Sequence, residues 1–194
     1  MEVIRHSSLR PIPWKNGGGI THEMMRVPAA GEPYRWRLSV AHIDVPGPFS
    51  NFAGYTRTMV LIKGAGLLLT FGGGNATLNE AGDMVEFDGA LATTCELRDG
   101  PCVDLNLIVS KTLRGVRAWV ERLRESRPVK PSNTTLAFAI SGYVSVDAGG
   151  ESTRLNEWDL AVLSPADRAA VGPAALDESA APLVFFATLD DNRQ

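Results

Sequence analysis

The stretch of the chain best equipped for chemistry is residues 13–23, Pro-Trp-Lys-Asn-Gly-Gly-Gly-Ile-Thr-His-Glu. Its three adjacent glycines permit unusual backbone angles or a close approach to another group. A cation, an amide, a hydroxyl and an imidazole flank them, on Lys15, Asn16, Thr21 and His22. We interpret this cluster as part of a binding site. A tight turn with solvated side chains is the alternative that the segment leaves open.

Further polar groups recur on strand-like segments that are otherwise apolar. Arginine presents a planar fork that suits a carboxylate, and amides or hydroxyls could orient the other polar atoms of a ligand. We therefore predict one ligand pocket in the N-terminal half, lined by Lys15, Asn16, Arg37, Ser39, Arg57 and Asn106. The alternative is an ion pair between Arg37 or Arg57 and Asp104 with no ligand, because buried charges are usually paired whatever the function.

The chain offers few residues for a metal or for catalysis. It has three histidines, His6, His22 and His42, with no His-x-His pair, so we expect neither a metal nor another cofactor. It also lacks the short motifs of nucleophilic hydrolases and of phosphate loops. Asp83 and Asp159 stand at the entry to strands, where a turn-stabilising role is expected.

The elements that must position these groups read as strands. Alternation over 34–40 places Tyr, Trp, Leu and Val on one strand face. Segments 57–63 and 67–71 are predicted to pair as a hairpin around a Gly-Ala-Gly link. Segment 103–109 reads as a half-buried strand, and 183–189 as a strand buried on both faces.

A weak internal repeat runs through residues 64–85 and 142–162, each with a glycine hairpin, Leu-Asn-Glu, Asp and an apolar strand. Two copies of a hairpin-rich unit imply two stacked barrels. We predict a mainly-β, bicupin-like fold of two small β-barrels packed as one compact unit. The expected parts are an N-terminal barrel with the pocket (1–111), a connector with a short helix or irregular strand (112–133), and a C-terminal half (134–194).

Three separated blocks carry a family resemblance: residues 13–19, residues 36–57 and the Asp-Leu-Asn-Leu of 104–107. Together they resemble the HutD/Ves family of bacterial cytoplasmic proteins. The resemblance implies a double-barrelled, cupin-like fold and a link to histidine breakdown, without an established chemical activity. The family usually has arginine where this chain has His22, so no role is carried over to that position.

Composition narrows the classes of partner. The net charge is −3 with scattered basic residues, whereas nucleic-acid binders show a basic stripe, so no nucleic acid is expected. We expect no signal peptide and no membrane partner, because no apolar run approaches spanning length. The expected location is cytoplasmic, with Cys95 and Cys102 as reduced thiols.

These observations favour a small-molecule-binding regulatory protein that holds a carboxylate metabolite without metal. The resemblance suggests urocanate or N-formylglutamate. A second hypothesis is a metal-free cupin-type enzyme, an isomerase or hydrolase, with His22 and Glu23 as acid and base. Adjacent strand residues point to opposite faces, so this pair could serve one substrate only from a loop. A third is a structural or partner-binding protein, and a homodimer is left open.

Overall fold

The computed structural model describes residues 1–129, 134–174 and 181–189. Strands hold 61% of the described residues and helices 3%, which confirms the mainly-β class. Neighbouring strands pair antiparallel throughout the described residues. The chain forms two compact units: an N-terminal unit, Leu9–Thr112, and a C-terminal unit, Met1–Ser8 with Leu113–Gln194. None of the described helices has the length and apolar character that a membrane span requires.

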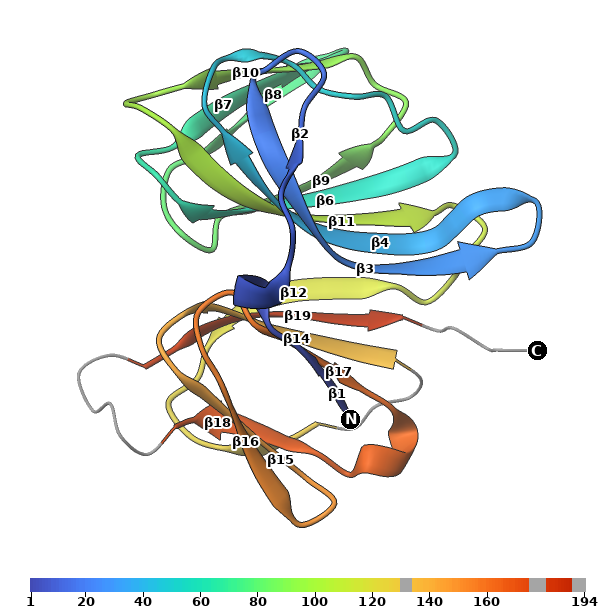
Figure 1. The fold of residues 1–194 in the computed structure, drawn as a ribbon. Helices are drawn as coiled ribbons and strands as arrows, with labels where there is room; N and C mark the ends of the chain where they lie inside the picture. The colour runs from blue at the N-terminus through green and yellow to red at the C-terminus, as the bar shows by residue number, and fades with distance from the viewer. Residues whose placement is uncertain (130–133, 175–180, 190–194) are drawn as a thin grey trace. The chain divides into compact units, whose positions relative to one another are not determined.

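The N-terminal unit consists of two sheets (Figure 1). One has the order β2-β3-β4-β11-β6-β9 and the other β5-β10-β7-β8. The strands are β2 (Ile12–Pro13), β3 (Gly19–Ala29), β4 (Glu32–Ile43), β5 (Gly47–Pro48), β6 (Tyr55–Lys63), β7 (Leu67–Phe71), β8 (Gly74–Leu78), β9 (Met84–Asp88), β10 (Thr93–Leu97) and β11 (Cys102–Ser110).

Two central strands of the larger sheet position most of the polar groups. Along β4 the predicted alternation holds, with Trp36 and Leu38 buried on one face. The expectation of a half-buried strand at 103–109 was wrong, because all nine residues of β11 are buried. This strand pairs with β4 on one edge and with β6 on the other. Its polar residues Asp104 and Asn106 therefore lie in the interior.

The predicted hairpin of 57–63 with 67–71 was also wrong. β6 pairs with β11 and β9, whereas β7 pairs with β10 and β8 in the other sheet. The Gly64–Gly66 link carries the chain from one sheet to the other. Side chains of both strands meet in one apolar core that includes Met59, Leu61, Leu67 and Leu69. Burial in that shared core replaces the local pairing that the glycines suggested.

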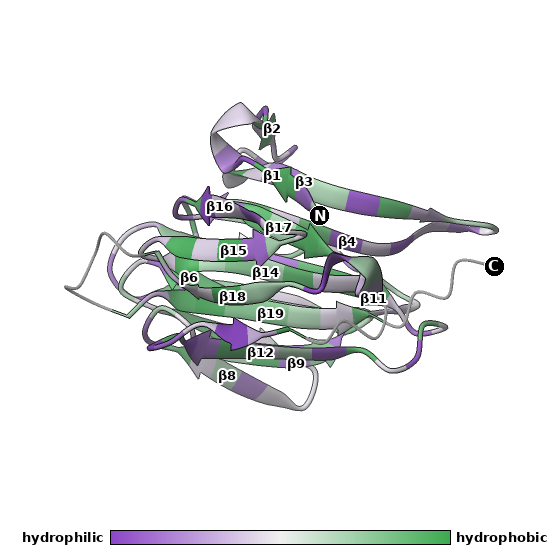
Figure 2. Ribbon diagram, turned by 90° about the horizontal axis from the view of Figure 1, so that it is seen from below, coloured by the Kyte–Doolittle hydropathy of each residue, from purple (hydrophilic) through white to green (hydrophobic). Residues whose placement is uncertain are grey.

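The C-terminal unit also consists of two sheets, in the orders β1-β17-β14-β19-β12 and β13-β18-β15-β16. Its elements are β1 (Glu2–Ile4), the 3-10 helix η1 (His6–Ser8), β12 (Arg117–Arg122), β13 (Arg127–Pro128), β14 (Thr134–Ser141), β15 (Val144–Ala148), β16 (Glu151–Leu155), β17 (Leu160–Leu163), η2 (Pro165–Asp167), β18 (Ala170–Pro173) and β19 (Leu183–Leu189). Figure 2 shows hydrophobic residues along β19, and all but one of its seven residues are buried, in agreement with the prediction for this segment. In both units the strand order over the described residues is open, and the two-barrel interpretation stays a prediction.

The division of the chain differs from the expected one at its start and in the connector, whereas the expected end of the first half lies within one residue of that of the N-terminal unit. Strand β1 pairs with β17, so the first eight residues belong to the C-terminal unit. The expected connector 112–133 contains a regular strand, β12, which pairs with β19 over six residues. Trp119 of β12 stacks on Phe186 of β19, with ring centroids 5.3 Å apart. The apolar residues whose spacing is compatible with a helix therefore belong to a strand that pairs in a sheet.

The internal repeat appears as two similar turns. The Asp83 carboxylate accepts hydrogen bonds from the Asn79 and Glu80 amides, and Asp159 accepts one from the Asn156 amide. Each turn has a left-handed residue just before the aspartate, Gly82 in the first and Trp158 in the second. The turn-stabilising role predicted for both aspartates agrees with these bonds.

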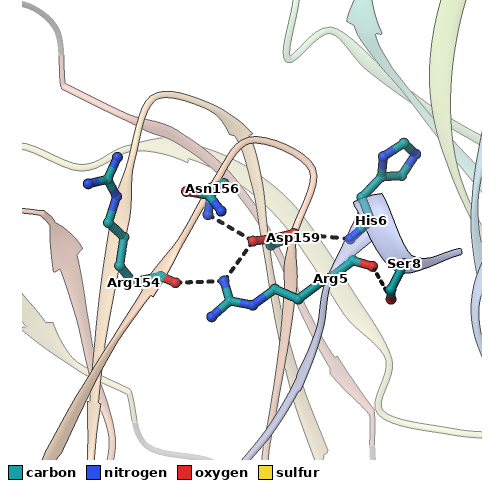
Figure 3. A network of polar contacts seen from close by, with 6 residues as sticks. All are labelled: Arg5, His6, Ser8, Arg154, Asn156 and Asp159. Carbon is teal, nitrogen blue, oxygen red and sulfur yellow. Dashed lines mark hydrogen bonds and ion pairs between the residues drawn. The ribbon is translucent and has the colours of Figure 1, made fainter.

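Asp159 also anchors the start of the chain within the C-terminal unit (Figure 3). Its Oδ2 accepts a hydrogen bond from Arg5 Nη1 at 2.7 Å, and its Oδ1 accepts one from the His6 amide at 3.0 Å. Arg5 Nη1 also donates to the Arg154 carbonyl at 2.7 Å. With 3% exposure, Asp159 is a buried carboxylate whose charge is satisfied by several donors.

Candidate functional site

The N-terminal unit contains a pocket of about 560 Å³. Its walls come from the β2–β3 segment, from β4, from the segment after β5, and from β6 and β11. All six residues predicted from the sequence line it: Lys15, Asn16, Arg37, Ser39, Arg57 and Asn106. The structure thus brings together groups as far apart in the sequence as Lys15 and Asn106. Whether they bind a ligand stays a prediction.

The pleat of the larger sheet explains this convergence. Arg37 and Ser39 alternate with the apolar residues of β4 and share its pocket face. Asn106 of β11 pairs with Ser39, and Ile108 pairs with both Arg37 and Arg57. Arg37, Ile108 and Arg57 therefore form one cross-strand row on that face.

Arg57 is held at the base of the pocket by a chain of hydrogen bonds. Its Nε and Nη2 donate to Asn106 Oδ1, at 2.9 and 2.5 Å. Asn106 Nδ2 in turn donates to Asp104 Oδ2 at 2.9 Å. Arg57 Nη2 lies 3.9 Å from the same Asp104 oxygen. The ion pair considered as the ligand-free alternative is therefore present for Arg57, as a long contact bridged by an amide.

Aromatic rings surround the guanidinium of Arg57. Its Cζ lies 4.6 Å from the ring centroid of Phe49, 5.8 Å from that of Phe52 and 5.7 Å from that of Phe87. Cation–π attraction favours this placement, more strongly where water is excluded. Sequence reasoning missed these rings, although Phe49 and Phe52 stand in one of the blocks that carried the family resemblance. An arginine that follows two phenylalanines in a glycine-rich loop was the available signal.

Positive charge prevails along the lining of the pocket. Arg57 is 6% exposed, and burial lowers its pKa. Burial raises the pKa of Asp104 to about 6, against the opposing charge of Arg57 and the hydrogen bond from Asn106. Arg37 Nε pairs with Glu23 Oε2 at 2.8 Å. Exposed Lys15 makes no ion pair with any residue in the described part of the chain.

The glycine segment forms a tight hairpin that is also a wall of the pocket. The Trp14 amide donates to the Gly19 carbonyl at 2.9 Å, and Trp14 Nε1 donates to Thr21 Oγ1 at 2.8 Å. Asn16 Oδ1 accepts from the Gly18 amide at 3.0 Å, an Asx-type turn. Both interpretations of this segment are therefore compatible, because the tight turn presents Asn16 to the cavity.

The hypothetical acid–base pair does not converge. His22 and Glu23 are consecutive residues of strand β3, not of a loop, and pair with Val40 and Ser39 of β4, so their side chains point to opposite faces. Neither lines the pocket. The sequence hypothesis required a loop at this place, and the pairing of β3 with β4 removes it.

The histidines of the N-terminal unit lie closer together than their sequence spacing indicated. His22 pairs with Val40 and Ile20 with His42, so the two imidazoles are diagonal neighbours with centroids 5.4 Å apart. Burial lowers the pKa of both rings. Two imidazoles are half of an ordinary four-ligand zinc site. The expectation of no metal stays a prediction.

Comparison with known proteins finds a match to the HutD family over residues 6–180. An uncharacterized 21.2 kDa protein in the hutC 3' region of Pseudomonas putida is 35% identical over 162 residues, which are 82% of this chain and 84% of that protein. The crystal structure of a conserved protein of unknown function from Pseudomonas aeruginosa PAO1 has a TM-score of 0.85 and 28% identity, over 97% of this chain and 98% of that one. The structure of HutD from Pseudomonas fluorescens SBW25, in a formate condition, has a TM-score of 0.80 and 30% identity over the same shares.

A more distant likeness concerns the fold alone. A cupin 2 conserved barrel domain protein from Leptotrichia buccalis superimposes with a TM-score of 0.60 at 13% identity, over 97% of this chain and 96% of that one. The fold of the chain is therefore cupin-like. At this identity the likeness carries no information on ligands or activity.

Proposed function

The chain belongs to the HutD family, and we propose that it is a regulatory protein of histidine catabolism that binds a small carboxylate metabolite, such as urocanate or N-formylglutamate, without metal. The link to histidine rests on the family and on the relative described from the hutC region. The binding of a carboxylate rests on the pocket.

The observation that carries this proposal is the fixed orientation of Arg57. One N–H edge of its guanidinium is bonded to Asn106, and one of its faces lies over Phe49. Nη1 makes no hydrogen bond within the described residues and remains for a carboxylate at the floor of the cavity. A fork that is already ordered loses little side-chain entropy when it binds, which favours affinity.

The rest of the cavity suits a small anion with a flat or apolar body. A volume of about 560 Å³ falls within the ordinary range of small-molecule pockets. Trp14, Phe49 and Phe52 supply aromatic walls, while Ser39 and Asn16 supply polar atoms away from Arg57. Exposed Lys15 adds a second cation to attract the ligand or to bind a second carboxylate, as in N-formylglutamate.

The finer fold proposal is that each unit is one barrel of a bicupin. Its support is the cupin-like superposition over nearly the whole chain, together with the two similar hairpin turns. In such an arrangement the pocket is the mouth of the first barrel. An experimental structure in which the two sheets of a unit do not pack face to face around one apolar core would contradict it.

Isothermal titration calorimetry with urocanate and with N-formylglutamate tests the binding proposal. Arg57→Ala should weaken binding by about ten- to a hundred-fold, because a charge-assisted hydrogen bond contributes about 1.5–3 kcal/mol. Arg57→Lys should restore only part of this loss, since the planar fork is absent. Arg98→Ala is the matched control, because Arg98 is an exposed arginine of the same unit outside the pocket.

The outcomes separate the hypotheses. No heat with either compound at millimolar concentration contradicts carboxylate binding. Equal affinities of wild type and Arg57→Ala contradict the role of Arg57. Each compound should also be recovered unchanged after incubation with the protein, as shown by mass spectrometry. Its conversion would instead support the enzyme hypothesis.

A further inference from the structure

A buried carboxylate stands directly behind the arginine of the pocket. Asp104 is 1% exposed, and its Oδ2 accepts the hydrogen bond from Asn106. Its Oδ1 is also buried and accepts no hydrogen bond from the described residues. Burying an ionised carboxylate with one oxygen that accepts no hydrogen bond costs free energy, and this cost favours the protonated form of Asp104.

Few other charged or titratable groups face Asp104. Strand β6 contributes Arg57, and Arg37 of β4 lies two cross-strand rows away, opposite Ile108. From the other sheet, β10 contributes Cys95, whose pKa is raised by burial, and Cys102 precedes Asp104 on the same face of β11. Arg57 is therefore the one cation within 4 Å of Asp104 among the described residues, and the two opposite charges balance.

A carboxylate ligand would disturb this balance. Bound at the remaining edge of Arg57, it would place a second negative charge around the same guanidinium. Two carboxylates that share one site do not both ionise readily, and one of them takes up a proton. The ligand carboxylate would accept a hydrogen bond from Arg57, whereas Asp104 is buried and its Oδ1 accepts none from the described residues. The proton therefore goes to Asp104.

We propose that Asp104 makes ligand binding proton-coupled, so that the site takes up a carboxylate together with one proton held on the Asp104 carboxyl group. This inference rests on the proposed function, because it requires the ligand to bind beside Arg57. The proton comes from solvent or buffer and returns there when the ligand leaves. No bond to the ligand forms or breaks.

The size of the coupling follows from the geometry and the charge state. In the free protein the pKa of Asp104 is about 6. A second carboxylate nearby raises such a pKa by about two units. At pH 7 the site should then take up about 0.8 proton per ligand, and affinity should be about twenty-five-fold lower at pH 8 than at pH 6. The sign is fixed by the raised pKa: protonated Asp104 favours the anion, so binding weakens as pH rises.

The test is calorimetry of N-formylglutamate in two buffers of different ionisation enthalpy, MOPS and Tris, from pH 6 to 8. The difference in heat gives the number of protons taken up. N-formylglutamate is the probe because its amine is acylated and its carboxyl groups stay ionised over this range. The imidazole of urocanate would titrate in the same range. The variants are Asp104→Asn and the control Asp88→Asn, which removes an exposed carboxylate paired with Lys111.

Wild type and Asp88→Asn should show the proton uptake and the fall in affinity with pH. Asp104→Asn should show neither, and at pH 8 it should bind more than tenfold more tightly than wild type. Binding without proton exchange in wild type would overturn the coupling and leave the proposed function intact. Absence of binding in every buffer would overturn both.

A second measurement uses wild type alone, in case Asp104→Asn does not fold. Infrared difference spectra at pH 7 should show a protonated carboxyl band that appears when N-formylglutamate is added. Bound ligand without this band would contradict the inference.

Discussion

Replacing Asp104 by asparagine should stabilise the protein above pH 6, although Asp104 contacts an arginine. The pKa of this carboxyl is raised from 3.8 to about 6 in the folded protein, first by burial and against the attraction of Arg57. Because the folded state binds its proton more tightly than the unfolded state, the contribution of Asp104 is fully favourable below about pH 4. It is lost as pH rises through about 6.

The magnitude follows from the shift itself. A rise of about two units, at 1.36 kcal/mol per unit, makes the ionised form cost about 3 kcal/mol relative to the neutral form. The attraction of Arg57 is already contained in that net shift. Asparagine imitates the neutral form and can still accept the hydrogen bond from Asn106. We therefore expect Asp104→Asn to be up to about 3 kcal/mol more stable at pH 7.5 and nearly unchanged at pH 4.

Urea unfolding at pH 4, 6 and 7.5, with Asp88→Asn as the exposed control, measures this difference. Hydrogen exchange of the β11 amides reports on the N-terminal unit specifically, because β11 lies at the centre of its larger sheet. If Asp104→Asn were less stable than wild type at pH 7.5, the attraction between Asp104 and Arg57 would exceed the cost of burial. The reasoning here and the proton coupling would then both fail.

Two further substitutions test one local structure in each unit, the hairpin of the pocket wall and the Asp159 network. A Cβ added at Gly19 would lie 2.0 Å from the His42 carbonyl oxygen, so Gly19→Ala should destabilise the unit by about 2 kcal/mol or more and weaken ligand binding. Thermal unfolding and calorimetry check this, and unchanged values for both would contradict the tight hairpin. Asp159→Ala should cost about 2 kcal/mol, because Arg5 and two partly buried amides lose their acceptor. A urea midpoint equal to that of wild type would show that this network contributes nothing to stability.

The strands were largely predictable, whereas their partners were not. Alternation along β4 and the continuous apolar run of β19 reflect local periodicity, which sequence records directly. The pairing of β6 and β7 depends on which sheet each one completes, and their apolar residues fit a shared core equally well from either position. The Gly-Ala-Gly link has the composition of a hairpin, and only long-range contacts reveal that it joins two sheets.

The set of pocket residues was predictable because a polar side chain on an otherwise apolar strand is costly to bury unless it has a partner or faces a cavity. Arg57 and Asn106 met this criterion, and the structure places them in direct contact. Asp104 was recognised only as an alternative partner, since nothing in the sequence shows that one of its oxygens is left without a donor. The contact between Phe49 and Arg57 depends on how the loop that contains Phe49 folds over the arginine. A loop conformation leaves no periodic pattern in the sequence, so this contact could not be predicted.

The hairpin that forms one wall of the pocket also places a natural fluorophore, the indole of Trp14, at the site. Of the four tryptophans in the chain, Trp14 is the one that lines the cavity. Its indole is held by the bond to Thr21, so its emission should respond to what enters beside it rather than to motion of its own ring. The native, unlabelled chain therefore carries a fluorophore at the wall where the ligand is proposed to bind.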